Sequence, residues 1–323
     1  MSEPGRAWTN RWRTALLAVG VVMTGLVVRE IGPAQVSRAI LSAWRYLPLL
    51  VALEAAWMGM DVFVLRALLG ESAGRAPGLA YARSAATAYA VNVFFPAGRA
   101  SAEVTRATML SPWLGAGRAT VAALQLHGVS LLGTASISLC ALAAVVRRPD
   151  PSRGLALALA GSALLTGALG GLVSFGARAP RLWTFLGAHS RHFREIAGTP
   201  TAPWSRLLRA VSLSFAGRSI QSLLFTVAVA AATGALLPRT GLLAQGISLA
   251  GSTFGDAVPQ QAGVSEGAFL YFAGALDLAA TPARAVAIAL LVRVAQLSLA
   301  VACLVIGLVW KERGAQGAVV DPQ

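Results

Sequence analysis

The sequence has little charge, almost no lysine and no long polar stretch. Only 12% of its 323 residues are charged, whereas 56% are hydrophobic, and a soluble domain carries about twice that share of charge. Lys311 is the only lysine, so arginine supplies nearly all of the net charge of +14. A chain of this length accommodates about seven or eight apolar spans of about twenty residues, with short loops between them. We therefore expect residues 1–323 to form a single membrane domain.

Cysteine and histidine are also scarce, and their scarcity excludes several classes of function. Cys140 and Cys303 lie in apolar runs without metal-ligand spacing, so we expect neither a disulfide nor a redox role. The three histidines have no metal-ligand spacing either, and no nucleophile elbow or phosphate-binding glycine loop occurs. The arginines lie between apolar runs rather than on a soluble face, which argues against nucleic-acid binding. The sequence predicts no catalytic residues, no metal, no cofactor and no nucleic-acid partner.

Apolar runs predict an all-α, polytopic integral membrane protein with about eight transmembrane helices. A retained first helix is preferred over a signal peptide, because no small-x-small cleavage site follows the first run. Residues 178–209 carry six arginines, and the positive-inside rule places this connector in the cytoplasm. We expect a multi-pass protein of the cell membrane, and the predicted spans are residues 12–28, 47–69, 77–95, 118–146, 154–176, 210–237, 241–258 and 282–310.

Two stretches interrupt the apolar pattern with proline, glycine and charge. The first runs from Asn92 to Arg106, and the second runs from Gly255 to Glu266. In both stretches a glutamate follows a proline by seven residues, and the two prolines, Pro96 and Pro259, are 163 positions apart. A broken helix persists in a bilayer only where protein or a water-filled cavity covers its backbone. The two stretches therefore predict two broken or re-entrant segments that face a cavity.

The 163-residue spacing also predicts an internal repeat. Sliding the sequence by this distance superposes three predicted spans of residues 47–146 on three predicted spans of residues 210–310. Residues 147–209 then form the fifth span and the connector between two repeat-like halves. If each proline stretch leads into a further short membrane segment, both termini and the connector lie inside and the halves are inverted. Transporters with paired repeats place such breaks near the midplane, where helix ends face the substrate.

At these two stretches the chain resembles the lysylphosphatidylglycerol synthase transmembrane family of flippase-like membrane proteins. The first family pattern is matched by Asn92, Pro96, Gly98, Arg99, Glu103 and Arg106. The second is matched by Pro259, Gly263, Glu266 and Arg293. The resemblance implies a stand-alone member without the aminoacyl-transferase domain, which moves a lipid between leaflets. It also implies that these ten residues bind the substrate, in which Arg99 and Arg106 hold phosphate oxygens of a headgroup through their guanidinium groups.

Several of these residues also have structural explanations. Glu103 and Arg106 are spaced as a surface helix pair, and Glu266 is placed to satisfy backbone donors at a helix start. Arg293 lies at a depth where charge is costly, so we expect a partner among Asp256, Glu266 and Asp277. Other polar residues in apolar runs have two interpretations. Glu54 and Asp61 pair with Arg66 or another helix, or they have a functional role. Four more are interpreted as interhelical hydrogen-bonding residues: Gln125, Arg218, Gln221 and Gln296.

Three functions remain open from the sequence. The first is a lipid flippase or transporter that moves a (glyco)phospholipid, polyprenyl-linked or hopanoid-type lipid and binds anionic headgroups. The second is an intramembrane lipid-modifying enzyme with Glu103 or Glu266 as base. The third is a membrane partner that recruits a lipid-synthesis enzyme through the connector.

Overall fold

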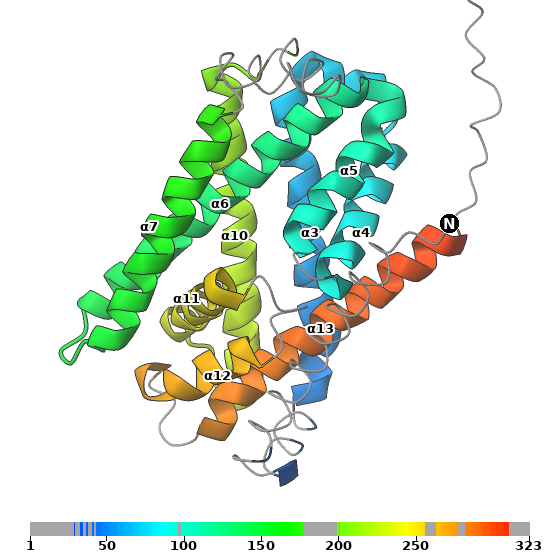
Figure 1. The fold of residues 1–323 in the computed structure, drawn as a ribbon. Helices are drawn as coiled ribbons and strands as arrows, with labels where there is room; N and C mark the ends of the chain where they lie inside the picture. Colours follow the sequence, from blue (N-terminus) through cyan, green and yellow to red (C-terminus); the bar gives the residue numbers. More distant parts are fainter. Residues whose placement is uncertain are drawn as a thin grey trace, which may run out of the picture.

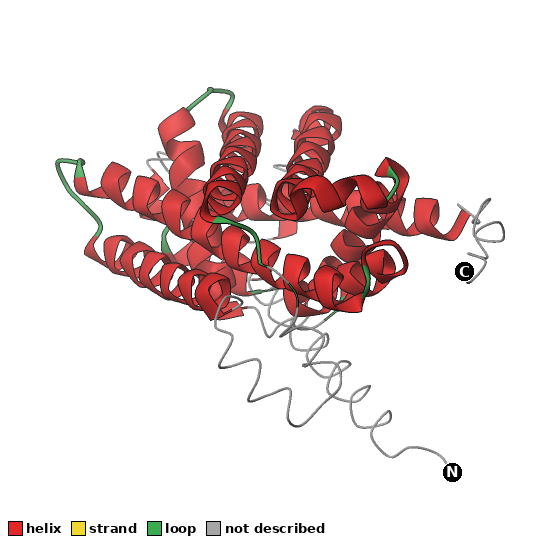
Figure 2. Ribbon diagram, turned by 90° about the horizontal axis from the view of Figure 1, so that it is seen from above, coloured by secondary structure: helices red, strands yellow, loops and turns green. Residues whose placement is uncertain are grey.

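The computed structural model describes residues 43–95, 98–176, 201–255, 263–276 and 282–309, with Thr199 and a few single positions before residue 43. These residues form nine α-helices, short 3-10 helices and connecting turns, and no strand occurs among them (Figure 2). The α-helices are α3 (Leu47–Leu69), α4 (Gly78–Phe94), α5 (Gly98–Leu114), α6 (Ala116–Val146), α7 (Arg153–Gly176), α10 (Trp204–Thr233), α11 (Pro238–Gly255), α12 (Val264–Tyr271) and α13 (Pro282–Val309).

Five helical segments are long and apolar enough to cross a membrane. They contain α3, α6, α7, α10 and α13, so the described part of the chain is that of a multi-pass, all-α membrane protein. The predicted spans 77–95 and 241–258 are helices, but neither is among the five. α4 has only 17 residues, and α11 has 18 residues that include several polar ones. The predicted span 12–28 lies outside the described residues.

Helix boundaries differ from the predicted ones by a few residues. α10 begins at Trp204, so the last residues of the predicted connector, 204–209, are helical. After the second proline stretch, α12 ends at Tyr271 and a 3-10 helix follows at Ala273–Leu276. Cys140 and Cys303 are both free cysteines and form no disulfide with each other, as the sequence predicts.

Contacts between helix ends define two opposite faces of the molecule. At one face the ring of Phe175 at the end of α7 lies 5.5 Å from the ring of Trp204 at the start of α10. Arg206 of α10 also approaches Glu71 of the 3-10 helix Gly70–Arg75 at 3.9 Å. We call this end the connector face, because the predicted connector joins α7 to α10.

At the other end, which we call the distal face, Arg239 of α11 donates a 2.8 Å hydrogen bond to the carbonyl of Ala144 near the end of α6. α3 therefore ends at the connector face and α10 begins there, and these two helices pack side by side (Figure 1).

The helices α4 and α5 form a hairpin, residues 78–114, that we call the first hairpin. α4 ends where Phe95 adopts an extended conformation, with φ −111° and ψ 144°, as expected for a residue that precedes a proline. α5 then returns beside α4 (Figure 1). Gly115 follows α5 with φ of +80°, which favours glycine, and α6 begins at the next residue. Both ends of the first hairpin therefore lie at the connector face.

The helices α11 and α12 form the second hairpin, residues 238–271. The end of α11 packs against the start of α12, because a Cβ on Gly251 would lie 3.4 Å from the Cβ of Ala268. α11 begins at the distal face beside α6. The 3-10 helix after α12 returns to that face, because Arg148 donates a hydrogen bond to the carbonyl of Ala275. The second hairpin thus opens toward the face opposite to that of the first.

Glycine permits a close approach between α6 and α7. A Cβ on Gly170 of α7 would lie 2.8 Å from the carbonyl oxygen of Gly128 in α6, and real Cβ atoms do not approach a carbonyl so closely. Leu157, Leu164 and Leu172 on α7 are exposed, although exposed leucine on a long apolar helix is unfavourable in water. This face of α7 is suited to contact with lipid tails.

Candidate functional site

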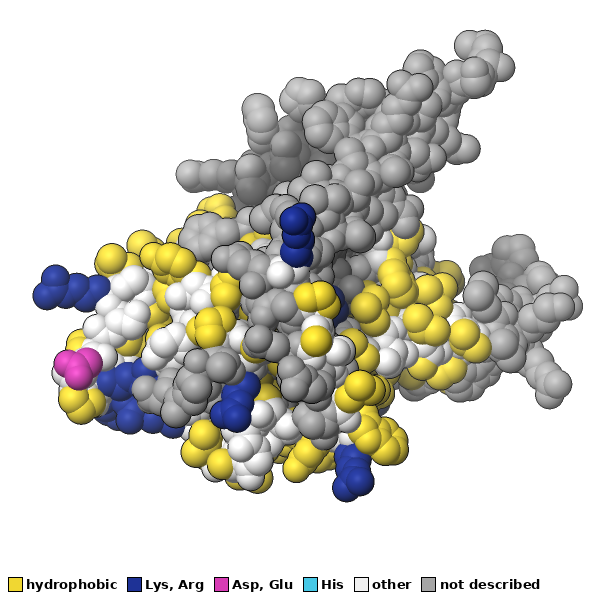
Figure 3. Space-filling view, turned by 90° about the horizontal axis from the view of Figure 1, so that it is seen from below, with side chains coloured by type: hydrophobic (Ala, Val, Ile, Leu, Met, Phe, Trp, Pro, Cys, Tyr) yellow, Lys and Arg dark blue, Asp and Glu magenta, His cyan; other side chains and the backbone are white. Residues whose placement is uncertain are grey.

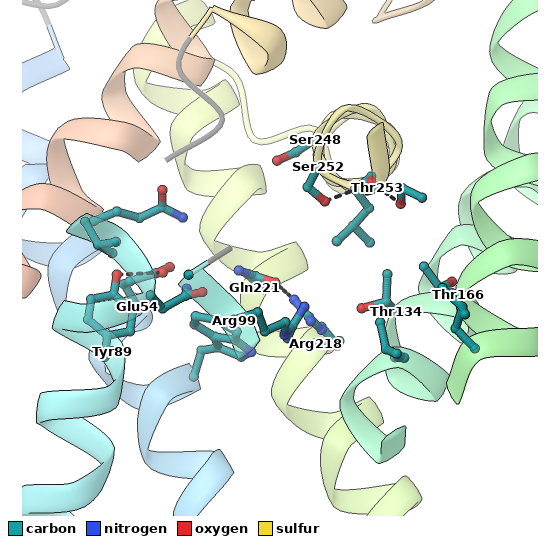
Figure 4. Close-up of a pocket in the computed structure, with 18 of the residues that line it drawn as sticks. Glu54, Tyr89, Arg99, Thr134, Thr166, Arg218, Gln221, Ser248, Ser252 and Thr253 are labelled. Carbon is teal, nitrogen blue, oxygen red and sulfur yellow. Dashed lines mark hydrogen bonds between the residues drawn. The ribbon is translucent and has the colours of Figure 1, made fainter. Parts of the chain in front are cut away.

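A cavity of about 190 Å³ lies between the two hairpins. The end of α4 and the start of α5 line it from the first hairpin, and the last two turns of α11 line it from the second. The helices α3, α6, α7, α10 and α13 complete its walls (Figure 4). Each of the five long apolar segments therefore contributes to one internal, polar site.

Three predicted site residues of the first proline stretch line this cavity: Asn92, Gly98 and Arg99. Pro96 lies outside the described residues. The turn brings Asn92 and Gly98 into direct contact, because a Cβ on Gly98 would lie 2.1 Å from the carbonyl oxygen of Asn92. Only glycine permits so close an approach of two backbone segments. Gly98 therefore places Arg99, the next residue, at the tip of the hairpin.

Two guanidinium groups converge at the centre of the cavity (Figure 4). Arg99 Nη2 donates a 2.6 Å hydrogen bond to Ser130 Oγ, and Arg218 Nη2 donates a 3.3 Å hydrogen bond to the same oxygen. Arg218 also donates from Nη1 to Gln221 Oε1 at 2.7 Å. The two cations therefore share one neutral hydroxyl as acceptor, and two arginines and one glutamate are the charged residues among the lining residues of the cavity.

Packing fixes the orientation of Arg218. Its side chain is 3% exposed, and its guanidinium carbon lies 5.3 Å from the centre of the Trp57 ring. An arginine in this position stacks on the ring face and keeps its donors in the plane of the guanidinium fork. That planar fork matches the oxygens of a phosphate or carboxylate.

A carboxylate lines the same cavity beside the two arginines (Figure 4). Glu54 of α3 is fully buried, and its Oε1 accepts a 2.9 Å hydrogen bond from the Tyr89 hydroxyl (Figure 4). Gln296 of α13 also lines the cavity. The structure thus gives Glu54 a partner on α4 rather than Arg66, whose guanidinium carbon lies 5.8 Å from the Tyr81 ring.

Hydroxyl groups from three helices form the remaining wall. Thr134 comes from α6 and Thr166 from α7, while α11 contributes Ser248, Ser252 and Thr253 (Figure 4). Several of these hydroxyls donate to a backbone carbonyl one turn earlier: Thr134, Thr166 and Thr253. Such bonds leave oxygen lone pairs available, so this wall offers neutral hydrogen-bond acceptors to a ligand.

Glu103 and Arg106 lie on α5 outside the cavity lining. Arg106 is buried, and its Nη1 lies 3.4 Å from Glu103 Oε2 while its Nη2 lies 3.6 Å from Asp61 Oδ2 of α3. The two residues therefore interact at the i, i+3 spacing that also had a structural interpretation. Asp61 has Arg106 as its partner, and this contact joins the first hairpin to α3.

The predicted residues of the second proline stretch form a separate buried ion pair. Glu266 Oε1 lies 2.7 Å from Arg293 Nη1, and Glu266 Oε2 accepts a 2.9 Å hydrogen bond from the backbone N–H of Gly263. Glu266 is therefore the partner expected for Arg293, and it also satisfies a donor at the start of α12. Asp256, Pro259 and Asp277 lie outside the described residues.

The cavity also contains residues that sequence analysis did not assign to a site. The sequence predicts Arg218, Gln221 and Gln296 as interhelical hydrogen-bonding residues, and it does not single out Tyr89 or the hydroxyl wall. The signal for Arg218 was a charge inside an apolar run, where a charge is costly and is usually functional. Within the described part of the chain, no group of three or more His, Cys, Asp and Glu side chains is arranged to hold a metal ion.

The fold and the site define a multi-pass, all-α membrane protein with a buried cavity that has two arginines and one glutamate on its walls. Comparison with protein-family models, with curated proteins and with solved structures found no match to the chain.

Proposed function

We propose that the protein is a lipid flippase or lipid transporter that moves a phosphate-bearing lipid between the leaflets of a cell membrane. The observation that carries this proposal is a polar cavity inside a bundle of apolar helices, with two arginines and one glutamate among its lining residues. A guanidinium group at the centre of a membrane helix costs about 2.5–3.5 kcal/mol on insertion scales. Two of them in one cavity against one carboxylate, Glu54, leave an excess of positive charge that favours an anionic ligand, and the fork geometry of Arg99 and Arg218 fits phosphate oxygens.

The edge of the cavity favours a lipid over a soluble anion. Three apolar residues that line the cavity are also partly exposed: Phe95, Leu165 and Leu169. A headgroup bound by Arg99 and Arg218 therefore has an apolar edge beside it, at which acyl or polyprenyl tails remain in the bilayer. A soluble anion has no tails to pack against this edge, and it would lose part of its hydration shell there.

The two hairpins supply a route from each leaflet to the cavity. We interpret α3, the first hairpin and α6 as one half of an inverted repeat, and α10, the second hairpin and α13 as the other. The hairpins open to opposite faces, and residues near both tips line the cavity. Each hairpin is then a re-entrant segment, which enters and leaves the bilayer at the same face and adds no crossing to those of the five long helices. Paired repeats of this kind support alternating access through movement of one half against the other.

The proposal keeps the predicted family and departs from its predicted set of substrate-binding residues. Arg99 remains a headgroup ligand, and Arg218 joins it. Glu103, Arg106, Glu266 and Arg293 instead fix the hairpins to neighbouring helices. Orientation in the cell membrane, with the connector face in the cytoplasm, also remains a prediction from the distribution of arginine.

A leaflet-specific assay tests this function. Proteoliposomes carry a fluorescent phosphatidylglycerol in both leaflets, and a membrane-impermeant reductant bleaches the outer leaflet. Wild-type protein is expected to move fluorescent lipid from the inner leaflet to the outer leaflet, where the reductant bleaches it. Arg99→Gln and Arg218→Gln each remove a guanidinium fork from the cavity and are expected to slow this by at least about tenfold. Arg75→Gln removes an exposed arginine of the connector face and is the control.

Two results would count against the proposal. One is the absence of movement for every phospholipid and polyprenyl phosphate tested with folded wild-type protein. The other is a wild-type rate in both cavity variants.

A further inference from the structure

A second pocket, with a volume of about 840 Å³, opens at the distal face. Three segments far apart in the sequence line it: the α6–α7 turn from Arg148 to Gly154, Arg239 at the start of α11, and Tyr271 to Ala275 after α12. We call it the distal pocket. It shares no lining residue with the cavity between the hairpins.

The charge of the distal pocket is predominantly positive. Arg148, Arg153 and Arg239 line it, and Asp150 is the one acidic residue among its lining residues. Seen from below, basic side chains gather at the end of the molecule where α6 meets α7, with an acidic side chain beside them (Figure 3). Such a pocket attracts anions.

Two helix starts add to this positive field. Arg153 and Gly154 are the first two residues of α7, and Arg239 is the second residue of α11. The N–H of Leu155 already donates to Ser152 Oγ and Pro238 has no N–H, but both helices are long enough to present a partial positive charge at this end. The arginines and the helix starts therefore act in the same direction.

Two of the arginines are held in place by the backbone of neighbouring elements. Arg239 donates to the carbonyl of Ala144, at 2.8 Å, and Arg148 donates to the carbonyl of Ala275. A guanidinium group has five donors, so the backbone bond of Arg239 orients its side chain and leaves other N–H groups to face the pocket. The site is preorganised across three elements.

Exposed apolar side chains lie in or near the lining segments of the distal pocket in the sequence and indicate its depth. Val146 at the end of α6 is 60% exposed, Leu236 before α11 is 68% exposed, and Tyr271 is 79% exposed. Valine and leucine at this exposure fit contact with lipid tails, and tyrosine favours the headgroup region. The pocket therefore lies at headgroup depth, with tails able to extend along the apolar residues.

The arginines of the distal pocket lie on the side of the molecule that is predicted to face away from the cytoplasm. Arginine is expected to accumulate on the cytoplasmic side, which the connector with its six arginines assigns to the connector face. α7 separates that face from the distal pocket. Arginines on the opposite side are therefore not explained by topology, whereas an anionic ligand explains them.

We propose that the distal pocket is a second anion site, which binds the phosphate group of a lipid headgroup in the leaflet at the distal face. Arg153 and Arg239 hold the phosphate oxygens together with the N–H groups at the starts of α7 and α11. Free phosphate has the same chemistry, so the test separates the two sources. The site is distinct from the headgroup cavity and does not depend on lipid movement.

The test measures binding of phosphatidylglycerol to full-length protein in detergent micelles, with native mass spectrometry as the readout. All proteins carry Arg99→Gln and Arg218→Gln, so that the cavity between the hairpins does not contribute. Added to this background, Arg153→Gln with Arg239→Gln is expected to weaken binding by at least about tenfold. Arg147→Gln is the matched control, because Arg147 is an exposed arginine of the same turn that does not line the pocket.

The ligand arms identify the source of the phosphate. Dioleoylglycerol has the same kind of tails without a phosphate and is expected not to bind. Inorganic phosphate that fails to displace phosphatidylglycerol supports a lipid as the occupant, and displacement at equal concentration supports a soluble phosphate in the same site. Equal binding of dioleoylglycerol, no effect of the double substitution, or an equal loss in Arg147→Gln would each overturn the proposal.

Discussion

The two hairpins share an architecture but differ in the chemistry that they bring to the cavity. The first hairpin supplies a cation, Arg99, directly from its tip. The second supplies neutral hydroxyls from α11 (Ser248, Ser252 and Thr253), and its buried acid, Glu266, is paired away from the cavity with Arg293. Among the described residues of the two hairpins, the first therefore provides the charge that lines the cavity.

The hairpins also differ in how they are fixed to the long helices. Glu266 is fully buried, and one short contact joins it to Arg293 of α13. Arg106 of the first hairpin has two longer contacts, one of them to Asp61, which is 27% exposed. An ion pair that is shorter and more deeply buried needs more free energy to break. The comparison predicts that the second hairpin is fixed firmly and that the first, which carries Arg99, moves more easily.

The largest expected effect is the loss of Arg293. Arg293→Met leaves the Glu266 carboxylate buried without its cation, and removal of one partner of a buried pair costs about 3–5 kcal/mol. Thermal unfolding in detergent is expected to show this destabilisation, and Glu266→Gln in the same chain is expected to recover part of it. An Arg293→Met protein as stable as wild type would show that the pair does not fix the second hairpin.

A smaller effect is expected at the tip of the first hairpin. Gly98→Ala places a Cβ 2.1 Å from the Asn92 carbonyl oxygen, so the turn must shift at a cost of about 1–3 kcal/mol. Gly74→Ala is the control, because nothing lies within 4 Å of its added Cβ. Equal unfolding temperatures for the two variants would contradict the close approach that positions Arg99.

Loss of Arg106 is expected to cost less than loss of Arg293. Arg106→Met breaks the longer contacts to Glu103 and to the partly exposed Asp61, for which we expect about 1–2 kcal/mol. A direct comparison of the two variants by chemical unfolding tests the difference between the hairpins. If Arg106→Met lowers the free energy of unfolding as much as Arg293→Met does, the first hairpin is held to the long helices as firmly as the second.

Some features of the fold and the site follow from local rules and could be predicted. Pro96 ends α4 because a residue before proline cannot remain helical easily, and Phe95 is extended as that rule requires. Arg293 required a buried partner, and Glu266 is one of the three that were expected. The five long apolar helices lie in runs that hydropathy alone marks in the sequence.

Other features depend on tertiary packing that sequence patterns do not contain. Glu103 and Arg106 carry the same charges whether they face a cavity or a neighbouring helix, and only the rotation of α5 decides between these. Serine and threonine are common in membrane helices and usually bond to their own backbone, so the hydroxyl wall had no distinctive signal. Arg218 was visible as a buried charge, but its convergence with Arg99 depends on how α10 packs against the first hairpin.

The central claim is that the cavity lies between two hairpins that open to opposite faces, and cysteine labelling tests it most directly. Gly74 precedes the first hairpin and Gly274 follows the second; both are exposed, and nothing lies within 4 Å of an added Cβ at either position. Gly74→Cys and Gly274→Cys are made separately in a background without Cys140 and Cys303. In oriented vesicles, a membrane-impermeant thiol reagent is expected to label them from opposite sides. Labelling of both from the same side would contradict the account.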